Sequence, residues 1–333
     1  MSRKVAWASG AHGTYLRTVD GGLTWIPAQV PDAGTLDFRA VVAFSTDEAF
    51  LMSAGPGEQS RIYHTGDGGR SWQLQFTNTN PKGFFDSMTF WDSRHGVVLG
   101  DPITDESGKL KFEVLLTDDG QNWRAVRSAG LPDAKDGEGA FAASNTCIAI
   151  APAASDSNIW FATGGKAARV FHSGDRGRSW EVFDTPMVHG PDSAGIFSIA
   201  FRDSKHGVIA GGDYKHPNED GPNLAFTEDG GKTWTLSALH PLAYFSAVAY
   251  DRRVNASTML DGVGAKKKML VKPIPPERIF IVGQDFVFDF RPPSNPRRIG
   301  GKKSLGIRFN AVSGYPEGGA LVVGPKGAMA FIP

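Results

Sequence analysis

One eight-residue pattern, Ser/Thr-x-Asp-x-Gly-x-Thr/Ser-Trp, recurs along the chain and constrains its fold more than any other feature. Four nearly complete copies occupy Thr18–Trp25, Thr65–Trp72, Ser173–Trp180 and Thr227–Trp234. A fifth, Leu116–Trp123, keeps the acid, the glycine and the tryptophan but neither hydroxyl residue. Successive acids lie 47 to 57 residues apart, and this spacing is typical of a repeat of four β-strands.

The residue types in this octapeptide predict a tight turn between two strands. The acid accepts hydrogen bonds from nearby backbone N–H groups, and the glycine two positions later supplies a positive φ. The tryptophan opens the next strand and buries a large apolar area between sheets. We therefore assign a structural role to all five acids, Asp20, Asp67, Asp118, Asp175 and Asp229.

A second pattern, strand–turn–strand, precedes the octapeptides, as in Phe85–Asp101 and Phe197–Asp213. Together the two patterns predict an all-β, seven-bladed propeller of four-stranded antiparallel blades, built as a single domain over residues 1–333 with about 26 strands. The strand that lines the central channel of each blade is expected at about 38–44, 84–90, 141–150, 196–202, 244–250 and 307–312.

The first and last blades are expected to be incomplete, with three strands each. Blade one begins at its second strand, Val5–Gly10, and blade seven ends with Gly327–Phe331. An N-terminal segment of roughly 20–30 further residues would supply both absent strands, so we expect unpaired edges there. Blade six is irregular: residues 251–305 contain Lys266–Lys268 and two proline pairs, Pro275-Pro276 and Pro292-Pro293, but no octapeptide. We interpret this stretch as a solvated loop insertion.

Composition excludes several function classes. Lys+Arg and Asp+Glu both number 35, so the chain lacks the basic excess of a nucleic-acid binder. The single cysteine, Cys147, permits no internal disulfide and reads as a packed thiol in a strand. We expect no membrane span, no cofactor and no metal, because no apolar run is long enough and no ligand spacing is present. We do not expect the first residues to be a signal peptide, because they lack its apolar segment.

The octapeptide resembles the Asp-box, also called the bacterial neuraminidase repeat. With segments such as Trp7–Thr18, Asn80–Asp86, Gly137–Ser144 and Val323–Gly327, the chain is similar to bacterial repeat proteins that resemble the photosystem II stability and assembly factor. More distantly it is similar to sialidase-like propellers. The resemblance implies a seven-bladed propeller, a monomeric binding or assembly role, and a periplasmic or secreted location whose signal segment is absent from this sequence.

Propeller geometry places a binding site on the face opposite the octapeptides. That face carries the connections between second and third strands and between blades, which include the long loops 101–109, 128–140, 185–195 and 212–222. Polar residues gather there in the sequence pattern. The candidate site residues, which form a polar bowl at the channel mouth, are Arg39, Asp86, Asp101, Glu138, Ser198, Asp213, Ser246 and Asn310.

Three function classes compete. The resemblance favours a non-catalytic propeller that binds a protein or a carbohydrate at the channel mouth. The alternative is a glycoside hydrolase that uses two of Asp86, Asp101, Glu138 and Asp213, since a pair of carboxylates suffices for that chemistry. A sialidase is disfavoured, because the Arg-Ile-Pro motif of that family is absent. An oxidoreductase is also disfavoured, because Gly10–Gly13 and Thr163–Gly165 do not open a dinucleotide-binding helix.

The histidines are expected to be structural. His95 and His206 occupy equivalent His-Gly turns of the repeat, and His64 and His172 directly precede octapeptide hydroxyls.

Overall fold

The structure is a computed structural model that describes residues 4–126, 130–152, 157–238, 243–251, 278–283, 286–290, 297–299, 309–315 and 318–332. The predicted insertion lies mostly outside these ranges, including Lys266–Lys268 and both proline pairs. Within the described part of the chain no helix is long and apolar enough to cross a membrane. Short 3-10 turns occur at Gly57–Gln59 (η1) and Pro325–Gly327 (η4).

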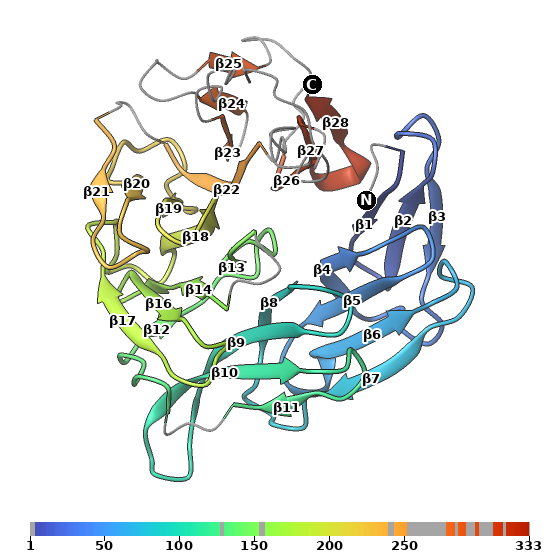
Figure 1. Cartoon of the computed structure of the whole chain (residues 1–333), viewed down its shortest axis with the longest axis horizontal. Coiled ribbons are helices and arrows are strands. Elements are labelled where there is room, and N and C mark those ends of the chain that lie inside the picture. Colours follow the sequence, from blue (N-terminus) through green and yellow to red (C-terminus); the bar gives the residue numbers. More distant parts are fainter. Residues whose placement is uncertain are drawn as a thin grey trace, which may run out of the picture.

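Seven antiparallel sheets surround a central channel and form a seven-bladed propeller, as predicted (Figure 1). Among the described residues, the first and last blades have three strands each. Blade one comprises β1 (Ala6–Ser9), β2 (Thr14–Thr18) and β3 (Ile26–Gln29). Blade seven comprises β26 (Ala311–Gly314), β27 (Ala320–Val323) and β28 (Met329–Ile332).

Four-stranded order recurs in the blades between them. Blade two is β4 (Asp37–Ala43), β5 (Ala49–Ala54), β6 (Arg61–Thr65) and β7 (Gln73–Thr77). Blade three is β8 (Phe85–Phe90), β9 (Gly96–Thr104), β10 (Leu110–Thr117) and β11 (Arg124–Ala125). Blade four is β13 (Ile148–Ile150), β14 (Ile159–Ala162), β16 (Arg169–Ser173) and β17 (Glu181–Asp184). Blade six is β22 (Phe245–Tyr250), β23 (Ile279–Gly283), β24 (Phe286–Phe290) and β25 (Arg297–Ile299).

Blade five carries two additional short strands that tie it to blade four. Its own strands are β18 (Ala194–Phe201), β19 (Gly207–Asp213), β20 (Leu224–Thr227) and β21 (Thr235–Leu236), and its sheet continues through β15 (Gly164–Gly165) to β12 (Glu138–Gly139). β15 follows β14 of blade four and meets β18 at the pair Gly164 and Gly195. A side chain on Gly195 would collide with the backbone of Gly164, so the crossing between the two blades requires glycine here.

Apolar side chains from successive sheets fill the spaces between blades. Six buried clusters each join one pair of successive blades, from blades one and two to blades six and seven. Trp180 and Trp234 of the octapeptides are buried in two of these clusters, which confirms the predicted wedge for these two. Trp72 and Trp123 are partly buried against two others, and Trp25 belongs to none of the six. Among the described residues no such cluster joins blade seven to blade one.

The octapeptide turns have the predicted hydrogen bonds. In the first, the Thr18 hydroxyl donates to Asp20 at 2.7 Å and accepts the Gly22 N–H at 3.0 Å. Asp20 also accepts the N–H and the hydroxyl of Thr24. Equivalent bonds surround Asp67, Asp175 and Asp229.

The fifth turn corrects the sequence alignment, because Asp119 and not Asp118 holds it. Asp119 accepts the N–H groups of Gln121 and Asn122 and the Thr117 hydroxyl. Here the Thr117 hydroxyl accepts the N–H of Gly120, three residues later in the chain. In the other turns the corresponding hydroxyl accepts the N–H of the glycine four residues later. This turn is therefore one residue shorter. Asp118 is exposed and forms a surface ion pair with Arg124.

The predicted inner strand of blade four is also wrong in extent. Only Ile148–Ile150 forms the strand β13, whereas we expected residues 141–150. Residues 141–146 instead cross the channel and form hydrogen bonds with other blades. This channel-crossing segment shapes the candidate site.

A pair of substitutions tests the corrected fifth turn. We expect Asp119→Ala to lower the melting temperature, because it removes the acceptor of several backbone bonds, and Asp118→Ala to leave it nearly unchanged, because exposed ion pairs contribute little. The turn's hydrogen bonds hold the pKa of Asp119 far below its ordinary value of 3.8. The stability it contributes is thus present above pH about 4 and is lost as pH falls further. Thermal melts of the two variants between pH 2 and 7 measure this; equal effects of both substitutions at pH 7 would contradict the assignment.

Candidate functional site

The central channel is a cavity of about 2000 Å³. Three of the predicted site residues, Arg39, Ser246 and Asn310, line it. Two others, Asp101 and Glu138, line a smaller cleft of about 420 Å³ beside the channel. The predicted bowl is therefore divided between two spaces, and only part of it faces the channel.

β-bulges at the start of the inner strands direct the mouth residues. Register shifts place one extra residue in blades two, three, five and six, at Arg39, Asp86, Phe197 and Ser246 respectively. A bulge turns the side chain of the extra residue out of the regular alternation of the strand. The predicted equivalence of Arg39, Asp86 and Ser246 thus has a backbone cause.

In blade five the equivalent residue is Phe197, one position before the predicted Ser198. Ser198 is fully buried, and its hydroxyl accepts the Val248 N–H at 2.9 Å. It links the inner strands of blades five and six rather than facing the channel. The repeat pattern aligns residues by type and cannot detect the bulge. It therefore assigned Ser198 to the channel-facing position that Phe197 occupies.

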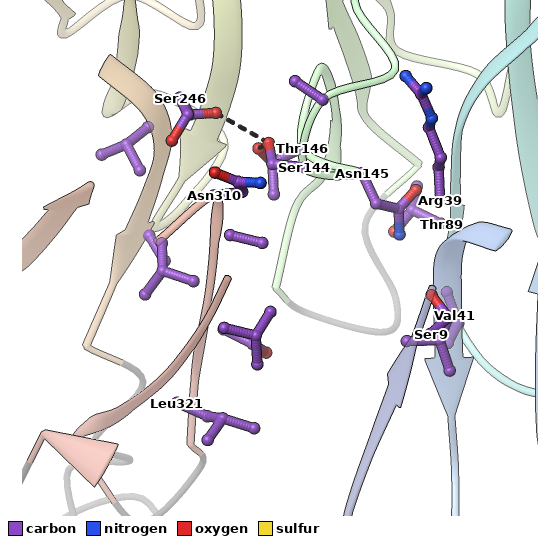
Figure 2. A pocket seen from close by; sticks show the side chains of 18 of the residues that line it. Ser9, Arg39, Val41, Thr89, Ser144, Asn145, Thr146, Ser246, Asn310 and Leu321 are labelled. Carbon is purple, nitrogen blue, oxygen red and sulfur yellow. Dashed lines mark hydrogen bonds between the residues drawn. The ribbon is translucent and has the colours of Figure 1, made fainter. Parts of the chain in front are cut away.

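The channel-crossing segment, residues 141–146, narrows the mouth and binds the inner strands around it. Arg39 donates to the Ala142 carbonyl at 3.1 Å, and the Ser144 hydroxyl donates to the Ser246 carbonyl at 2.9 Å. Figure 2 shows Ser144, Asn145 and Thr146 between Ser246 and Asn310 on one side and Arg39 and Thr89 on the other. The segment therefore fixes the positions of side chains from several blades.

Asn145 is the most constrained residue of this segment. It has a φ of 59°, a conformation that asparagine tolerates better than most residues. Its side-chain oxygen accepts the Met88 N–H at 2.7 Å and the Ser87 hydroxyl at 3.1 Å. These bonds to blade three hold the backbone in the left-handed region and give the mouth a rigid floor.

Asp86 of β8 and Asp101 of β9 form an acidic pair near this segment. Asp86 is 1% exposed, and one of its carboxyl oxygens has no hydrogen-bond partner among the described residues. Burial and the neighbouring Asp101 raise its pKa well above the ordinary value, against the opposing charge of Arg39. Burial also raises the pKa of Asp101, which accepts the Ala140 N–H at 3.0 Å.

The other two candidate acids are engaged in structural bonds. Glu138 is paired with Arg169 through two bonds of 2.9 and 2.5 Å and accepts the Thr163 hydroxyl at 2.6 Å. Both side chains are buried, so this ion pair holds the junction of blades four and five. Burial opposes ionisation of Asp213, but bonds from His216, Ser193 and Lys215 outweigh it and lower its pKa to about 2.

An aromatic cluster at the mouth is the feature that the sequence analysis missed. Phe141 and Phe197 stack with ring centroids 3.8 Å apart. Tyr214 and Tyr244 pack edge-on against Phe197, with centroids at 6.1 and 4.9 Å. All four rings line the channel cavity, and Tyr214 is 49% exposed. Each ring lies within two residues of the predicted start of an inner strand or end of a second strand. These positions at the channel mouth were the sequence signal that could have identified the cluster.

Backbone hydrogen bonds fix the two tyrosines. The Tyr214 N–H donates to the Ser193 carbonyl, and the Tyr244 N–H donates to the Pro217 carbonyl. Asp213 caps the turn that follows, through the Lys215 N–H and the His216 ring. The aromatic surface is therefore preorganised, which lowers the entropic cost of binding.

Histidines and acids do not assemble a metal site in the described part of the chain. His95 and His206 bond to Asp92 and Asp203 within their turns, at 2.8 and 2.9 Å. Both lie at the ends of inner strands, on the octapeptide face, as the repeat pattern predicts for structural residues.

Two substitutions that should shift the melting temperature in opposite directions test the electrostatics of the mouth. The pKa of Asp86 is raised in the fold, so the folded state loses stability as pH rises above about 4 and this carboxyl group ionises. Asparagine does not ionise, so the melting temperature of Asp86→Asn should exceed that of wild type by an amount that grows toward pH 8. The pKa of Asp213 is lowered to about 2, so Asp213→Asn should melt below wild type at pH 7 and approach it near pH 2. Thermal melts across this range measure both; a pH-independent difference for either variant would contradict its assignment.

Comparison with known proteins supports the fold alone. No family model and no curated protein matches the sequence. The structure is similar to that of "YCF48 bound to D1 peptide", with a TM-score of 0.64, 16% identity, and coverage of 99% of this chain and 90% of that one. It is also similar to virginiamycin B lyase from Staphylococcus aureus in a complex with quinupristin, with a TM-score of 0.56, 12% identity, and coverage of 100% and 94%. An ancestral GH74 enzyme matches with a TM-score of 0.54 and 14% identity over 87% of this chain and 35% of the enzyme. The chain thus shares its propeller architecture with binding proteins and with enzymes.

Proposed function

We propose that the chain is a non-catalytic propeller of the Asp-box type that binds a polypeptide segment at the channel mouth. The observation that carries this proposal is the preorganised aromatic cluster of Phe141, Phe197, Tyr214 and Tyr244, which lines the same cavity as Arg39. Tyrosine and arginine are among the side chains that most often dominate protein interfaces. The mouth therefore offers both an apolar contact and a cation for a peptide.

Arg39 retains capacity to bind a ligand. Its guanidinium donates to Asp37 at 2.9 Å and to the Ala142 carbonyl at 3.1 Å, and its side chain is 44% exposed. A guanidinium carries five N–H donors, so donors remain for a peptide carbonyl or carboxylate. The solved neighbour that holds a D1 peptide is consistent with peptide binding by this architecture.

Hydrolysis is the weaker candidate because the four acids are poorly placed for it. Glu138 and Asp213 are engaged with Arg169 and His216, and Asp86 does not line either cavity. Only Asp101 retains a raised pKa together with access to a cleft. A glycosidase needs two accessible carboxyl groups on either side of a sugar.

A selection from a random peptide library displayed on phage tests the proposal. We expect peptides to be enriched on the purified chain, and Tyr214→Ala to weaken their binding about 10–100-fold, the range for an aromatic interface anchor. Leu23→Ala is the matched control, because Leu23 is an 86% exposed apolar residue on the octapeptide face. Isothermal titration measures both variants. Equal affinities of Tyr214→Ala and wild type would contradict the site.

Assays with a panel of aryl glycosides test the alternative. The proposal predicts no turnover by the wild-type chain. Turnover that disappears in Asp101→Asn or Asp86→Asn, while the fold is retained, would establish a hydrolase instead.

A further inference from the structure

The channel cavity has an unusual extension where blades seven and one meet. In blades two to five its wall consists of inner strands and the mouth residues beside them. At this junction it also reaches second and third strands, through Ala8, Leu16, Leu321 and Met329. The two blades lie next to each other in Figure 1, and the described residues provide no apolar cluster between them. The cavity therefore extends outward as a slot.

The slot exists because none of the described strands lies between β1 and the channel axis. β1 corresponds to the second strand of the other blades, since the octapeptide joins β2 to β3 just as it joins β6 to β7. Neighbouring strands are 4.7–4.9 Å apart, so β1 lies about one strand spacing farther from the axis than an inner strand. Figure 2 shows Ser9 and Val41 on one side of the cavity and Leu321 across from them.

The floor of the slot is an unpaired strand edge. Antiparallel pairs alternate between hydrogen-bonded and non-hydrogen-bonded positions. Gly10 donates to the Thr14 carbonyl at 3.0 Å, and the register continues to Ala8 opposite Leu16 and Ala6 opposite Thr18. Ala8 and Ala6 therefore bond to β2, while the N–H and C=O groups of Trp7 and Ser9 point away from it. No other described residue bonds to these groups.

We propose that β1 is the docking edge for an extended polypeptide strand, which enters the slot and becomes the first strand of blade one. A row of backbone donors and acceptors with a two-residue period is complementary to a β-strand and to no other common ligand. Inner strands of the other blades bear the same open edge toward the axis, but only at β1 is one strand position vacant among the described residues. This inference rests on the proposed peptide-binding function and specifies how the peptide binds.

The lining of the slot specifies the chemistry of the docked strand. Its walls carry Val41 from blade two and Leu321 and Met329 from blade seven, so both faces of the strand require small or β-branched apolar side chains. The floor admits them, because a Cβ built on Gly10 meets no atom within 4 Å. Inner strands begin at the mouth and run along the channel toward the octapeptide face. The N-terminal end of the docked strand thus lies at the mouth, where the exposed Lys326 favours an acidic residue.

Amide hydrogen exchange tests the proposal with the probe acetyl-Glu-Val-Thr-Val-Ala-amide. We expect the amides of Trp7 and Ser9 to exchange rapidly in the free protein and to be protected at least tenfold by the probe. The amides of Ala6 and Ala8 are the internal control, because they already bond to β2. Fast exchange of Trp7 and Ser9 with saturating probe would overturn the proposal, and so would protection of both amides in its absence, since another segment of the chain would then fill the slot.

A substitution pair gives an independent measurement. Ser9→Pro removes one N–H that faces the slot and none that faces β2, so it should weaken probe binding about tenfold, the value of one hydrogen bond. Ser9→Ala keeps the N–H and should bind as wild type. Two probes N-methylated on alternate residues add a third test: only the one whose methyl groups face the axis should bind. Equal binding of both would contradict strand pairing.

The outcome separates this inference from the proposed function. Phage-selected peptides that depend on Tyr214 but not on Ser9 would retain the function and reject the slot. A probe that depends on Ser9 but not on Tyr214 would retain the slot and reject the aromatic site.

Discussion

The packing of one blade face against the next is the interaction on which this structure depends. A twisted four-stranded sheet has two apolar faces, and a ring of blades covers each face with a neighbour. The six apolar clusters between successive blades provide this cover, with Trp160 of blade four stacked on Phe201 of blade five at 3.7 Å as one example. In the part of the chain that the structure describes, no such cluster joins blade seven to blade one, and each of these two blades has three strands. Both the shape of the cavity and the unpaired edge of β1 follow from this.

The channel mouth acquires its rigidity from a different source. Propeller inner strands ordinarily contact only their neighbours, but residues 141–146 reach the inner strands of blades two, three, five and six. The aromatic cluster begins in the same segment, at Phe141, and continues onto the bulge residue Phe197. The segment that supports the mouth mechanically thus also carries part of its aromatic surface.

The sequence could predict features that repeat and could not predict those that depend on backbone irregularity. The turns of four octapeptides and the seven blades follow from local turn chemistry and spacing, and the structure confirms them. Among the described residues the terminal blades also have the expected three strands. The role of Asp118 was wrong because a one-residue deletion in the turn moves the hydrogen bonds to Asp119. Ser198 was predicted at the position that Phe197 occupies, because a bulge changes the direction in which side chains point and no residue type signals it.

The candidate site was harder to predict, since its members are brought together by tertiary contacts. Glu138 reads as a free acid until Arg169, 31 residues later, is placed against it. Residues 141–146 stand where the repeat places an inner strand, yet the hydrogen bonds of Asn145 and Ser144 to distant blades draw them across the channel. Neither partner is near in sequence, so periodicity contains no information about them.

The bond from Ser144 to Ser246 joins residues that are 102 positions apart. A contact of this separation closes a long loop, and it forms after the shorter-range contacts that make its formation less costly in entropy. During synthesis the segment emerges from the ribosome well before blade six, so it has no partner for Ser144 until more than a hundred further residues have been added. The mouth of the channel is therefore completed late, when most blades are in place, and a chain truncated before blade six would leave the Ser144 hydroxyl without its bond to Ser246.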